Sequence, residues 1–379
     1  MGSIPLPMID YQEFSLKVHD RAAEHRTIVN AQVEVTYGCN LRCVHCYTDC
    51  YNRPDLLKRE LRFEEVTRIL DQLHDQGCLW VCFTGGEIFA RKDFLEIYAY
   101  ANGKGFLITL FTNATLITER IADYLKAHPP FSLDISCHGA TAETFDAITQ
   151  VKGSFQRFLQ GVRLLMERGL PVRFKTKAMT LNLHELGQIK TLVESFGAEF
   201  RVNSAIYPRL DGDLSPANYR LQPEQIVAIE HSMQAEDQED ARCASAGATG
   251  LGPPPDDRLF RCGCGTTGVH IGAWGTLGTC TWVNEPRADL RTMSVAEGIS
   301  RVFPRVRGAR YETETPCRTC QVFTLCDKMP ANAGAETGDP ELPVEHFCRV
   351  AYQRAEALGH KAECPAGASS ARSDVRPTS

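Results

Sequence analysis

The chain has 379 residues, 43% of them hydrophobic, and a formal net charge of −6 at pH 7. This length can bury a full core in one large domain plus a smaller one, and a negative charge without long Lys or Arg runs argues against a general nucleic-acid binder. No stretch approaches the roughly 18 to 20 apolar residues that span a bilayer, and residues 1–20 lack the apolar core of a signal peptide. We therefore expect a cytoplasmic protein, without a membrane or nucleic-acid partner, that acts on a peptide or a small molecule.

The sixteen cysteines are the most unusual feature of the composition. Cytosolic thiols stay reduced, so metal or cluster ligation explains them better than a disulfide framework does. One group runs from Cys39 to Cys50 and a second from Cys243 to Cys364, with only Cys78, Cys82 and Cys137 between them. This distribution predicts two sites in two domains.

After an N-terminal extension over residues 1–30, short apolar runs alternate with helical patterns up to about residue 210. The predicted strands are 33–36, 79–83, 106–112, 131–136, 172–177 and 199–203. Helical spacing of apolar residues is clearest at Val66, Ile69, Leu70 and Leu73 and at Phe155, Phe158, Leu159, Val162 and Leu165. The repeat predicts an α/β fold in which six βα units over residues 31–210 form an open or partial barrel. Reacting groups in such folds lie on loops after the C-terminal ends of the strands.

The regular alternation fades after the sixth predicted strand. Residues 211–258 contain stretches rich in Gly, Pro, Ser and Asp, which are typical of a linker or bridging region. Residues 259–360 are rich in Cys and Gly, as expected for a small domain that clusters help to stabilise. We expect residues 361–379 to be a disordered tail.

Directly after the first predicted strand, Cys39, Cys43 and Cys46 form a C-x3-C-x2-C motif. Three thiolates on a four-iron cluster leave one iron without a protein ligand, whereas ferredoxin clusters use four cysteines. Zinc is the alternative, because it binds the same soft thiolates.

The segment from Cys39 to Tyr47 resembles the radical S-adenosylmethionine (SAM) superfamily, in the form common among its peptide-modifying members. The resemblance implies a partial (β/α)6 radical SAM barrel and a [4Fe-4S] cluster whose open iron binds SAM. It also implies cleavage of SAM to a 5′-deoxyadenosyl radical, which removes hydrogen from an unactivated carbon. In the family, the residue that corresponds to His45 packs near the adenine.

Two further segments resemble SAM-binding motifs of the same family. Thr84-Gly-Gly-Glu87 resembles the GGE motif, with Ile88 where proline is usual, and the segment ending at Ser136 resembles one that reaches the SAM ribose or carboxylate. We expect the glycines to let backbone approach SAM and Glu87 to accept a hydrogen bond from its ammonium group. Seen alone, these residues could be an ordinary turn, a solvated carboxylate and a strand-end hydroxyl. The resulting set of expected cofactor-binding residues is His45, Tyr47, Gly85, Gly86, Glu87, Asn113 and Ser136, with His138, Lys175 and Lys177 as further candidates.

The second cysteine group resembles the SPASM domain, which carries auxiliary iron–sulfur clusters, so the resemblance implies a small Cys-rich, SPASM-like C-terminal domain. Cys317, Cys320, Cys326 and Cys348 match the ligands of its outer cluster, and Cys280, after Gly275, matches a ligand of the inner one, with Cys262 or Cys264 at suitable spacing. The inner set lacks a cysteine where the chain reads Met329-Pro330. The inner cluster could keep an open iron, take Cys243 as a ligand, or not assemble, which leaves one or two auxiliary [4Fe-4S] clusters.

A zinc ribbon is the alternative for this region. We expect Cys50, Cys78, Cys82 and Cys137 to be bystander thiols, which are commonly buried as small hydrophobic groups.

The family resemblance implies a maturase that crosslinks, oxidises or epimerises a ribosomally made peptide. We expect it to need an electron donor such as flavodoxin or ferredoxin, and a separate leader-recognition protein, because the segment before the first strand is too short for a fused winged-helix domain. The alternatives within the enzyme class are a sulfatase-type maturase and a cofactor-biosynthesis enzyme acting on a molecule such as a tetrapyrrole. A non-catalytic electron carrier is the alternative of another class, but a carrier does not need the GGE or Ser136 segments.

Overall fold

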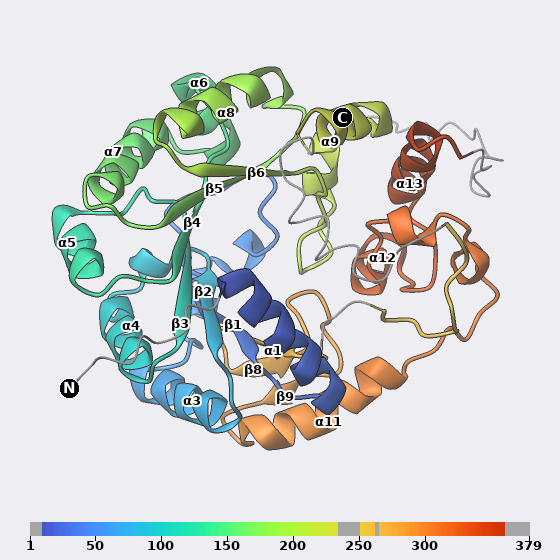
Figure 1. Cartoon of the computed structure of the whole chain (residues 1–379), viewed down its shortest axis with the longest axis horizontal. Helices are drawn as coiled ribbons and strands as arrows, with labels where there is room; N and C mark the ends of the chain where they lie inside the picture. Colours follow the sequence, from blue (N-terminus) through green and yellow to red (C-terminus); the bar gives the residue numbers. More distant parts are fainter. Residues whose placement is uncertain (1–9, 234–250, 262–264, 361–379) are drawn as a thin grey trace, which may run out of the picture. The chain divides into compact units, whose positions relative to one another are not determined.

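The computed structural model describes residues 10–233, 251–261 and 265–360 (Figure 1). The chain folds into two compact units. The first consists of residues 1–176, 181–201 and 261–308, and the second of residues 177–180, 202–260 and 309–379, each to the extent described. In the described part of the chain, no helix is both long and apolar enough to cross a bilayer.

One mixed sheet with the strand order β6-β5-β4-β3-β2-β1-β7-β8-β9 organises the fold. Its strands are β1 (Asn30–Thr36), β2 (Trp80–Gly85), β3 (Leu107–Thr112), β4 (Ser132–Ser136), β5 (Val172–Lys177), β6 (Glu199–Asn203), β7 (Gly268–Ile271), β8 (Thr276–Gly278) and β9 (Ala288–Asp289). Strands β1 to β5 pair in parallel in chain order, β7 adds a parallel strand on the far side of β1, and β8 and β9 pair antiparallel. The predicted α/β architecture is confirmed, although β7 to β9 were not predicted.

Helices α3 to α8 follow the strands and lie on the outer side of the sheet (Figure 1). The α-helices are α1 (Tyr11–His25), α2 (Pro54–Leu57), α3 (Phe63–Asp75), α4 (Phe94–Gly103), α5 (Glu119–Ala127), α6 (Ala142–Thr149), α7 (Ser154–Met166), α8 (Leu186–Ser195), α9 (Pro223–Met233), α11 (Val295–Gly308), α12 (Pro330–Thr337) and α13 (Glu345–Ala357). The short 3-10 helices are η1 (Asp49–Tyr51), η2 (Ile88–Ala90), η3 (Leu183–Glu185), η4 (Ser215–Tyr219), η5 (Pro316–Thr319) and η6 (Phe323–Leu325).

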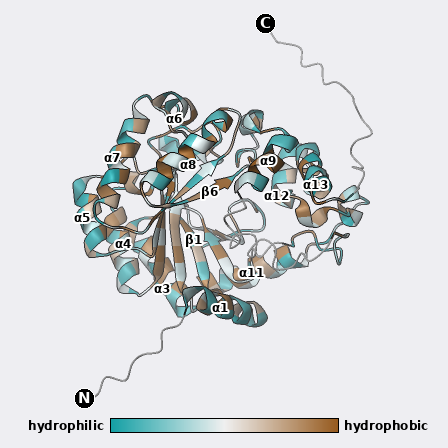
Figure 2. Cartoon of the chain, turned by 45° about the horizontal axis from the view of Figure 1, so that its top comes forward, coloured by the Kyte–Doolittle hydropathy of each residue, from teal (hydrophilic) through white to brown (hydrophobic). Residues whose placement is uncertain are grey.

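The core of the first unit lies between the sheet and these helices. In α3, the residues that set the helical pattern in the sequence, Val66, Ile69, Leu70 and Leu73, are all buried. Burying side chains of this size stabilises the fold by about 1.5 to 3 kcal/mol each. The helices in Figure 2 accordingly mix hydrophobic and hydrophilic residues, as expected when one face of each is buried.

Helix α1 falls within the predicted N-terminal extension and was not predicted, because its sequence carries few apolar residues. Asp10 caps it by accepting a hydrogen bond from the amide of Glu13. Its residues meet the N-terminal end of β2, where Trp80 Nε1 donates to the Tyr11 hydroxyl over 2.9 Å and the His19 and Trp80 ring centroids lie 4.9 Å apart. The helix is therefore part of the first unit.

The second unit contains α9, α12 and α13. Bidentate ion pairs hold it together, from Arg220 to Glu336 at 2.7 Å and from Arg354 to Glu230. We expected a linker at residues 211–258 and one Cys-rich domain at residues 259–360. The structure has a helix, α9, in the former range and groups residues 261–308 with the sheet. The expected tail, residues 361–379, lies outside the described residues.

Candidate active site

The loop that carries the first three cysteines leaves the end of β1 and is fixed by a carboxylate from outside the motif. Glu60 Oε1 accepts hydrogen bonds from the Tyr37 amide at 2.7 Å and from the Thr36 hydroxyl at 3.0 Å. Farther along the loop, the amides of Arg42 and Val44 donate to carbonyls at the end of α6, each at 3.0 Å. The loop is thus anchored at its start and in its middle.

Cys39, Cys43 and Cys46 lie together on this loop. Burial raises the pKa of Cys39 to about 12 and raises those of Cys43 and Cys46 as well, and the charges of neighbouring thiolates add to the effect on Cys39 and Cys43. Buried thiols that repel one another as thiolates need a cationic group to hold them deprotonated, which an iron–sulfur cluster provides. Within the described residues, no three His, Cys, Asp or Glu side chains converge on a single metal ion. The chemistry of these three buried thiols fits a cluster bound through three thiolates.

Gly85 and Gly86, at the end of β2, let this strand approach the cysteine loop backbone to backbone. Gly85 has φ +130°, and a Cβ there would lie 2.0 Å from the Thr36 carbonyl oxygen. A Cβ on Gly86 would lie 2.4 Å from the carbonyl oxygen of Gly38. The amides of Gly86 and Glu87 donate to the carbonyls of Thr36 and Gly38 at 2.8 and 2.9 Å. The glycines thus have a packing role that the sequence did not reveal, and their expected contact with SAM stays a prediction.

Glu87 is completely buried and joins the ends of β2 and β3. Its carboxylate accepts hydrogen bonds from the Thr112 hydroxyl at 2.8 Å, the Asn113 amide at 2.7 Å and the Phe89 amide at 3.1 Å. Burial nevertheless raises the pKa of Glu87 to about 6, against the opposing effect of these donors. The carboxylate therefore positions the loop after β3, a role in addition to the expected bond to the SAM ammonium, which stays a prediction.

Asn113 connects that loop to the cysteines. Its Nδ2 donates to Asn40 Oδ1 at 3.1 Å and lies 3.9 Å from the Cys39 sulfur, and its Oδ1 accepts from the amide and hydroxyl of Thr115. Asn40 in turn donates to the Thr115 hydroxyl at 2.7 Å. Asn113 and the cluster loop are therefore one hydrogen-bonded assembly, which places this predicted residue beside the expected ligands.

The loop after β4 brings a second predicted residue to the cysteine loop. The His45 and His138 rings meet edge to face with centroids 4.6 Å apart, although the two residues follow different strands. Ser136 ends β4, in register with Lys175 on β5. These residues line the same end of the sheet, as expected for side chains after parallel strands.

Tyr47 contacts a residue that the sequence did not single out. Its ring centroid lies 4.8 Å from that of Trp282, two positions after Cys280. Cys280 therefore lies near the cluster loop in the chain segment that follows β8. Cys262, Cys264 and the alternative ligand Cys243 lie outside the described residues, so the composition of the inner cluster stays a prediction.

The four predicted ligands of the outer cluster all belong to the second unit. Burial raises the pKa of Cys326 to about 12, and the charges of Asp327, Cys320 and Cys317 add to the effect. The Cys326 thiol also lies 3.8 Å from the carbonyl oxygen of Phe347, next to Cys348. Cysteines gathered in this way, Cys317 buried and the other three partly buried, fit a cluster ligated by Cys317, Cys320, Cys326 and Cys348.

The two lysine candidates contact acceptors within the protein. Lys177 belongs to the second unit and donates to Asn203 and to the carbonyl of Ala205, while Lys175 is ion-paired on the sheet. The expected bystanders Cys78 and Cys137 are buried, whereas Cys50 and Cys82 are partly exposed. Cys82 lines a cavity, which no pattern in the sequence indicated.

Comparison with known proteins finds one family model and several proteins that this chain resembles. Residues 33–194 match the family described as the radical SAM superfamily. The chain is 29% identical to the AdoMet-dependent heme synthase of Methanosarcina barkeri over 83% of this chain and 94% of that protein. It is 30% identical to the antilisterial bacteriocin subtilosin biosynthesis protein AlbA of Bacillus subtilis, over 45% of this chain and 38% of that protein.

A solved structure shares the fold. Streptococcus suis SuiB, bound to its precursor peptide SuiA, superposes with a TM-score of 0.64 over 90% of this chain and 82% of SuiB, at 16% identity.

Proposed function

We propose that this chain, whose residues 33–194 match the radical SAM superfamily, cleaves SAM at the Cys39, Cys43 and Cys46 loop in order to modify a peptide. The observation that carries the proposal is the assembly of this loop with the ends of β2 and β3 through Gly86, Glu87 and Asn113. When bound, the cluster and SAM supply a 5′-deoxyadenosyl radical that removes hydrogen from an unactivated carbon.

The chain's own residues bind and orient the cofactors. The three thiols hold the cluster, and the buried Glu87 fixes the backbone after β3, so that Asn113 stays beside Cys39. His45 and His138, in ring contact, form a wall beside the loop that excludes water from an adenine packed there. Tyr47, Gly85, Gly86 and Ser136 complete the proposed SAM site.

A peptide substrate is supported by two relatives. The chain shares its fold with SuiB, whose structure holds a precursor peptide, and resembles AlbA, a bacteriocin biosynthesis protein, in sequence. We propose that Cys317, Cys320, Cys326 and Cys348 would hold at least one auxiliary cluster, which would supply an acceptor for the electron that remains after hydrogen removal. The proposed partners are a leader-recognition protein and a flavodoxin or ferredoxin.

The test is anaerobic coexpression with short peptides encoded beside the gene, followed by mass spectrometry. The control is the Cys39/Cys43/Cys46→Ala variant. A mass change made only by the wild-type protein supports peptide maturation. Loss of two hydrogens indicates a crosslink or an oxidation, and a one-unit gain in heavy water indicates epimerisation. Production of 5′-deoxyadenosine without any peptide change contradicts a substrate among these peptides.

A second candidate is the modification of a tetrapyrrole. It is supported by the match to the heme synthase, which spans 94% of that protein, whereas the match to AlbA spans 38% of AlbA. Incubating the reduced protein with SAM and carboxylated tetrapyrroles tests it. A tetrapyrrole product that forms only with SAM, and not with the triple alanine variant, favours this candidate over the peptide.

A further inference from the structure

The inner face of the sheet carries polar and charged side chains in two adjacent rows. Residues that are in register on neighbouring strands share a face, and so do residues two apart on one strand. One row across β1 to β4 is Gln32, Cys82, Thr109 and Ser132, and the next, across β3 to β5, is Phe111, Asp134 and Arg173. This face belongs to the first unit.

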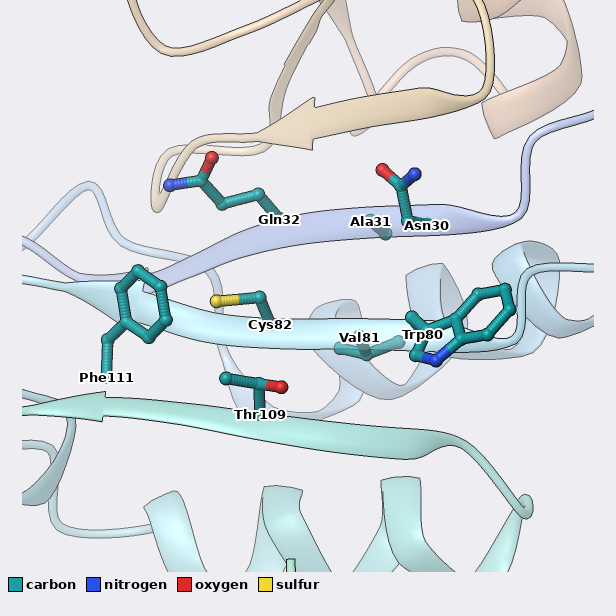
Figure 3. Close-up of a pocket in the computed structure, with 8 residues that line it drawn as sticks. All are labelled: Asn30, Ala31, Gln32, Trp80, Val81, Cys82, Thr109 and Phe111. Carbon is teal, nitrogen blue, oxygen red and sulfur yellow. The ribbon is translucent and has the colours of Figure 1, made fainter. Parts of the chain in front are cut away.

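A cavity of about 290 Å³ opens along the first of these rows. Gln32, Cys82, Thr109 and Phe111 line it, together with Trp80 and neighbouring residues. Figure 3 shows these side chains projecting from the three adjacent strands β1 to β3. The cavity is large enough for part of a substrate, and its lining mixes aromatic, amide, hydroxyl and thiol groups.

A buried carboxylate with two cations lies beside the cavity. The Asp134 side chain is 2% exposed, and Arg173 contacts it through Nη2 at 2.9 Å and Nε at 3.0 Å. Lys175 forms a second, close ion pair with the same carboxylate. The side chains of Arg173 and Lys175 remain 29% and 39% exposed. Two cations on one anion leave an excess positive charge on this part of the face.

The cation pair is close to the residues that line the cavity. Lys175 Nζ lies 4.3 Å from the centroid of the Phe111 ring, which lines the cavity. The ammonium group therefore points along the sheet toward the cavity and not beyond the ends of the strands. Burial raises the pKa of Cys82 to about 12. The Asp134 charge adds to this shift and the charges of Lys175 and Arg173 oppose it, as expected for groups within electrostatic reach.

Within the described residues, the N–H donors of the two cations outnumber the protein acceptors that contact them. Arg173 has five N–H groups and Lys175 has three. Both cations contact the Asp134 carboxylate, and Arg173 also donates to the Ser132 hydroxyl at 2.9 Å. A second buried carboxylate on this face, Glu34, lies 3.3 Å from His270 on β7. Glu34 is on β1, four strands from the pair on β5 in the sheet order, so Asp134 is the carboxylate in direct contact with the pair.

We propose that Arg173 and Lys175 bind a carboxylate group of the substrate at the Phe111 side of this cavity. The inference rests on the proposed function, because it assumes that the substrate enters the face beside the cysteine loop. Arg173 recognises a carboxylate through paired N–H groups, and Lys175 adds a point charge. Asp134 holds both cations in place and limits their net charge. The substrate class is thus one with a free carboxylate, which an acidic peptide side chain or a tetrapyrrole propionate provides.

The test measures binding of benzoate and benzamide, two molecules of similar size that differ in charge, to the full chain reconstituted with iron and sulfide. Saturation-transfer NMR gives both affinities. The wild-type protein should prefer benzoate, and Lys175→Gln should weaken benzoate binding about tenfold, as expected for loss of a charged hydrogen-bond partner, with little effect on benzamide. Asp134→Asn should tighten benzoate binding several-fold, because it removes a competing anion. Lys126→Gln, an exposed lysine on α5, is the surface-charge control.

Asp134→Asn separates a binding role from a structural one. If Arg173 and Lys175 only neutralise a buried carboxylate, removing that carboxylate would leave benzoate affinity unchanged or weaken it, and the proposal is then wrong. Equal binding of benzoate and benzamide to the wild-type protein also overturns it. Loss of SAM affinity in Lys175→Gln, with benzoate binding intact, would assign the pair to the cofactor and likewise overturn it.

Two further probe pairs identify the source of the carboxylate. Hemin is compared with its dimethyl ester, and a five-residue glycine peptide with a central aspartate is compared with its asparagine counterpart. Preference for one charged member, weakened by Lys175→Gln, supports the proposal and assigns the source. If the protein binds both members of each pair equally well, the binding of benzoate is that of an adventitious ion only, and the proposal fails.

The same preparations are assayed for 5′-deoxyadenosine without substrate. If the wild-type protein does not cleave SAM under any reductant, the proposed function fails. If it cleaves SAM but shows no charge preference, only the carboxylate site fails.

Discussion

The aromatic rings of Tyr47 and Trp282 lie with their centroids 4.8 Å apart. Tyr47 directly follows the last cysteine of the first motif, and Trp282 lies two residues after Cys280, so the contact joins two cysteine-bearing segments more than two hundred positions apart in sequence. The contact fixes the segment after β8 against the cluster loop, independently of any ligand.

Replacing Trp282 with Ala should loosen this junction. The loss of a partly buried aromatic pair is expected to lower the free energy of unfolding by about 2 kcal/mol, and Trp282→Phe should restore most of it. Hydrogen exchange of the peptide containing residues 43–47 should be faster in the alanine variant only. Equal exchange in both variants would show that the contact does not hold the loop.

The two groups of cysteines should be separable by mutation. Cys43→Ala should abolish SAM cleavage while auxiliary-cluster iron remains, because Cys43 belongs to the loop after β1. Cys320→Ala should lower the iron content and stop product formation with less effect on SAM cleavage. The measurements are iron per chain and 5′-deoxyadenosine yield. Equal loss of SAM cleavage in both variants would contradict this division.

Gly86→Ala tests the close approach of β2 to the cysteine loop. A Cβ at this position would lie 2.4 Å from the Gly38 carbonyl oxygen, a backbone atom that cannot move without shifting the loop. We expect a loss of about 1 to 3 kcal/mol in unfolding free energy and reduced cluster loading. The control is Gly187→Ala in α8, where a Cβ meets nothing within 4 Å and should raise helix stability slightly. Similar stability of the two variants would refute the packing role.

Glu87 should make stability depend on pH in the protein before cluster assembly. Its pKa is raised from 4.5 to about 6 by burial, so the folded state binds the proton more tightly than the unfolded state does. The stabilisation from this proton is complete below about pH 4.5 and is lost as the pH rises through 6, a change of about 2 kcal/mol.

The measurement is denaturant unfolding of the wild-type protein and Glu87→Gln between about pH 4.5 and 7. Glutamine removes the titration, so the wild-type stability should fall relative to the variant as the pH rises. A constant difference over this range would contradict the raised pKa.

The barrel strands could be predicted from sequence because their apolar runs are long and lie between helical patterns. The predicted boundaries of β5 and β6 coincide with the observed strands, and those of β2 to β4 agree to within two residues. By contrast, Gly268–Ile271 is only four residues long and pairs with β1, far away in sequence, so no local pattern marks it.

The residues of the candidate site also fall into those that a local sequence signal identified and those that it did not. Cysteine spacing and the GGE segment are local signals, and they identified the loops that the structure brings together. The contact between His45 and His138 depends on how two loops meet, and the pairing of Asp134 with Arg173 depends on strand register. The spacing of residues along the sequence reveals neither the loop contact nor the register. Glu60 was missed because a single carboxylate outside a motif carries no signal.

The central position of β1 in the sheet has a consequence for synthesis of the chain. β1 pairs with β2 on one side and with β7 on the other, and β7 lies near the end of the first unit in sequence. During translation, β1 to β5 can pair soon after they emerge, while the second edge of β1 presents unpaired N–H and C=O groups until the ribosome has released β7. A nascent chain that stalls before Gly268 therefore exposes a strand edge directly next to the cysteine loop, and cofactor insertion before that point would act on an incomplete sheet.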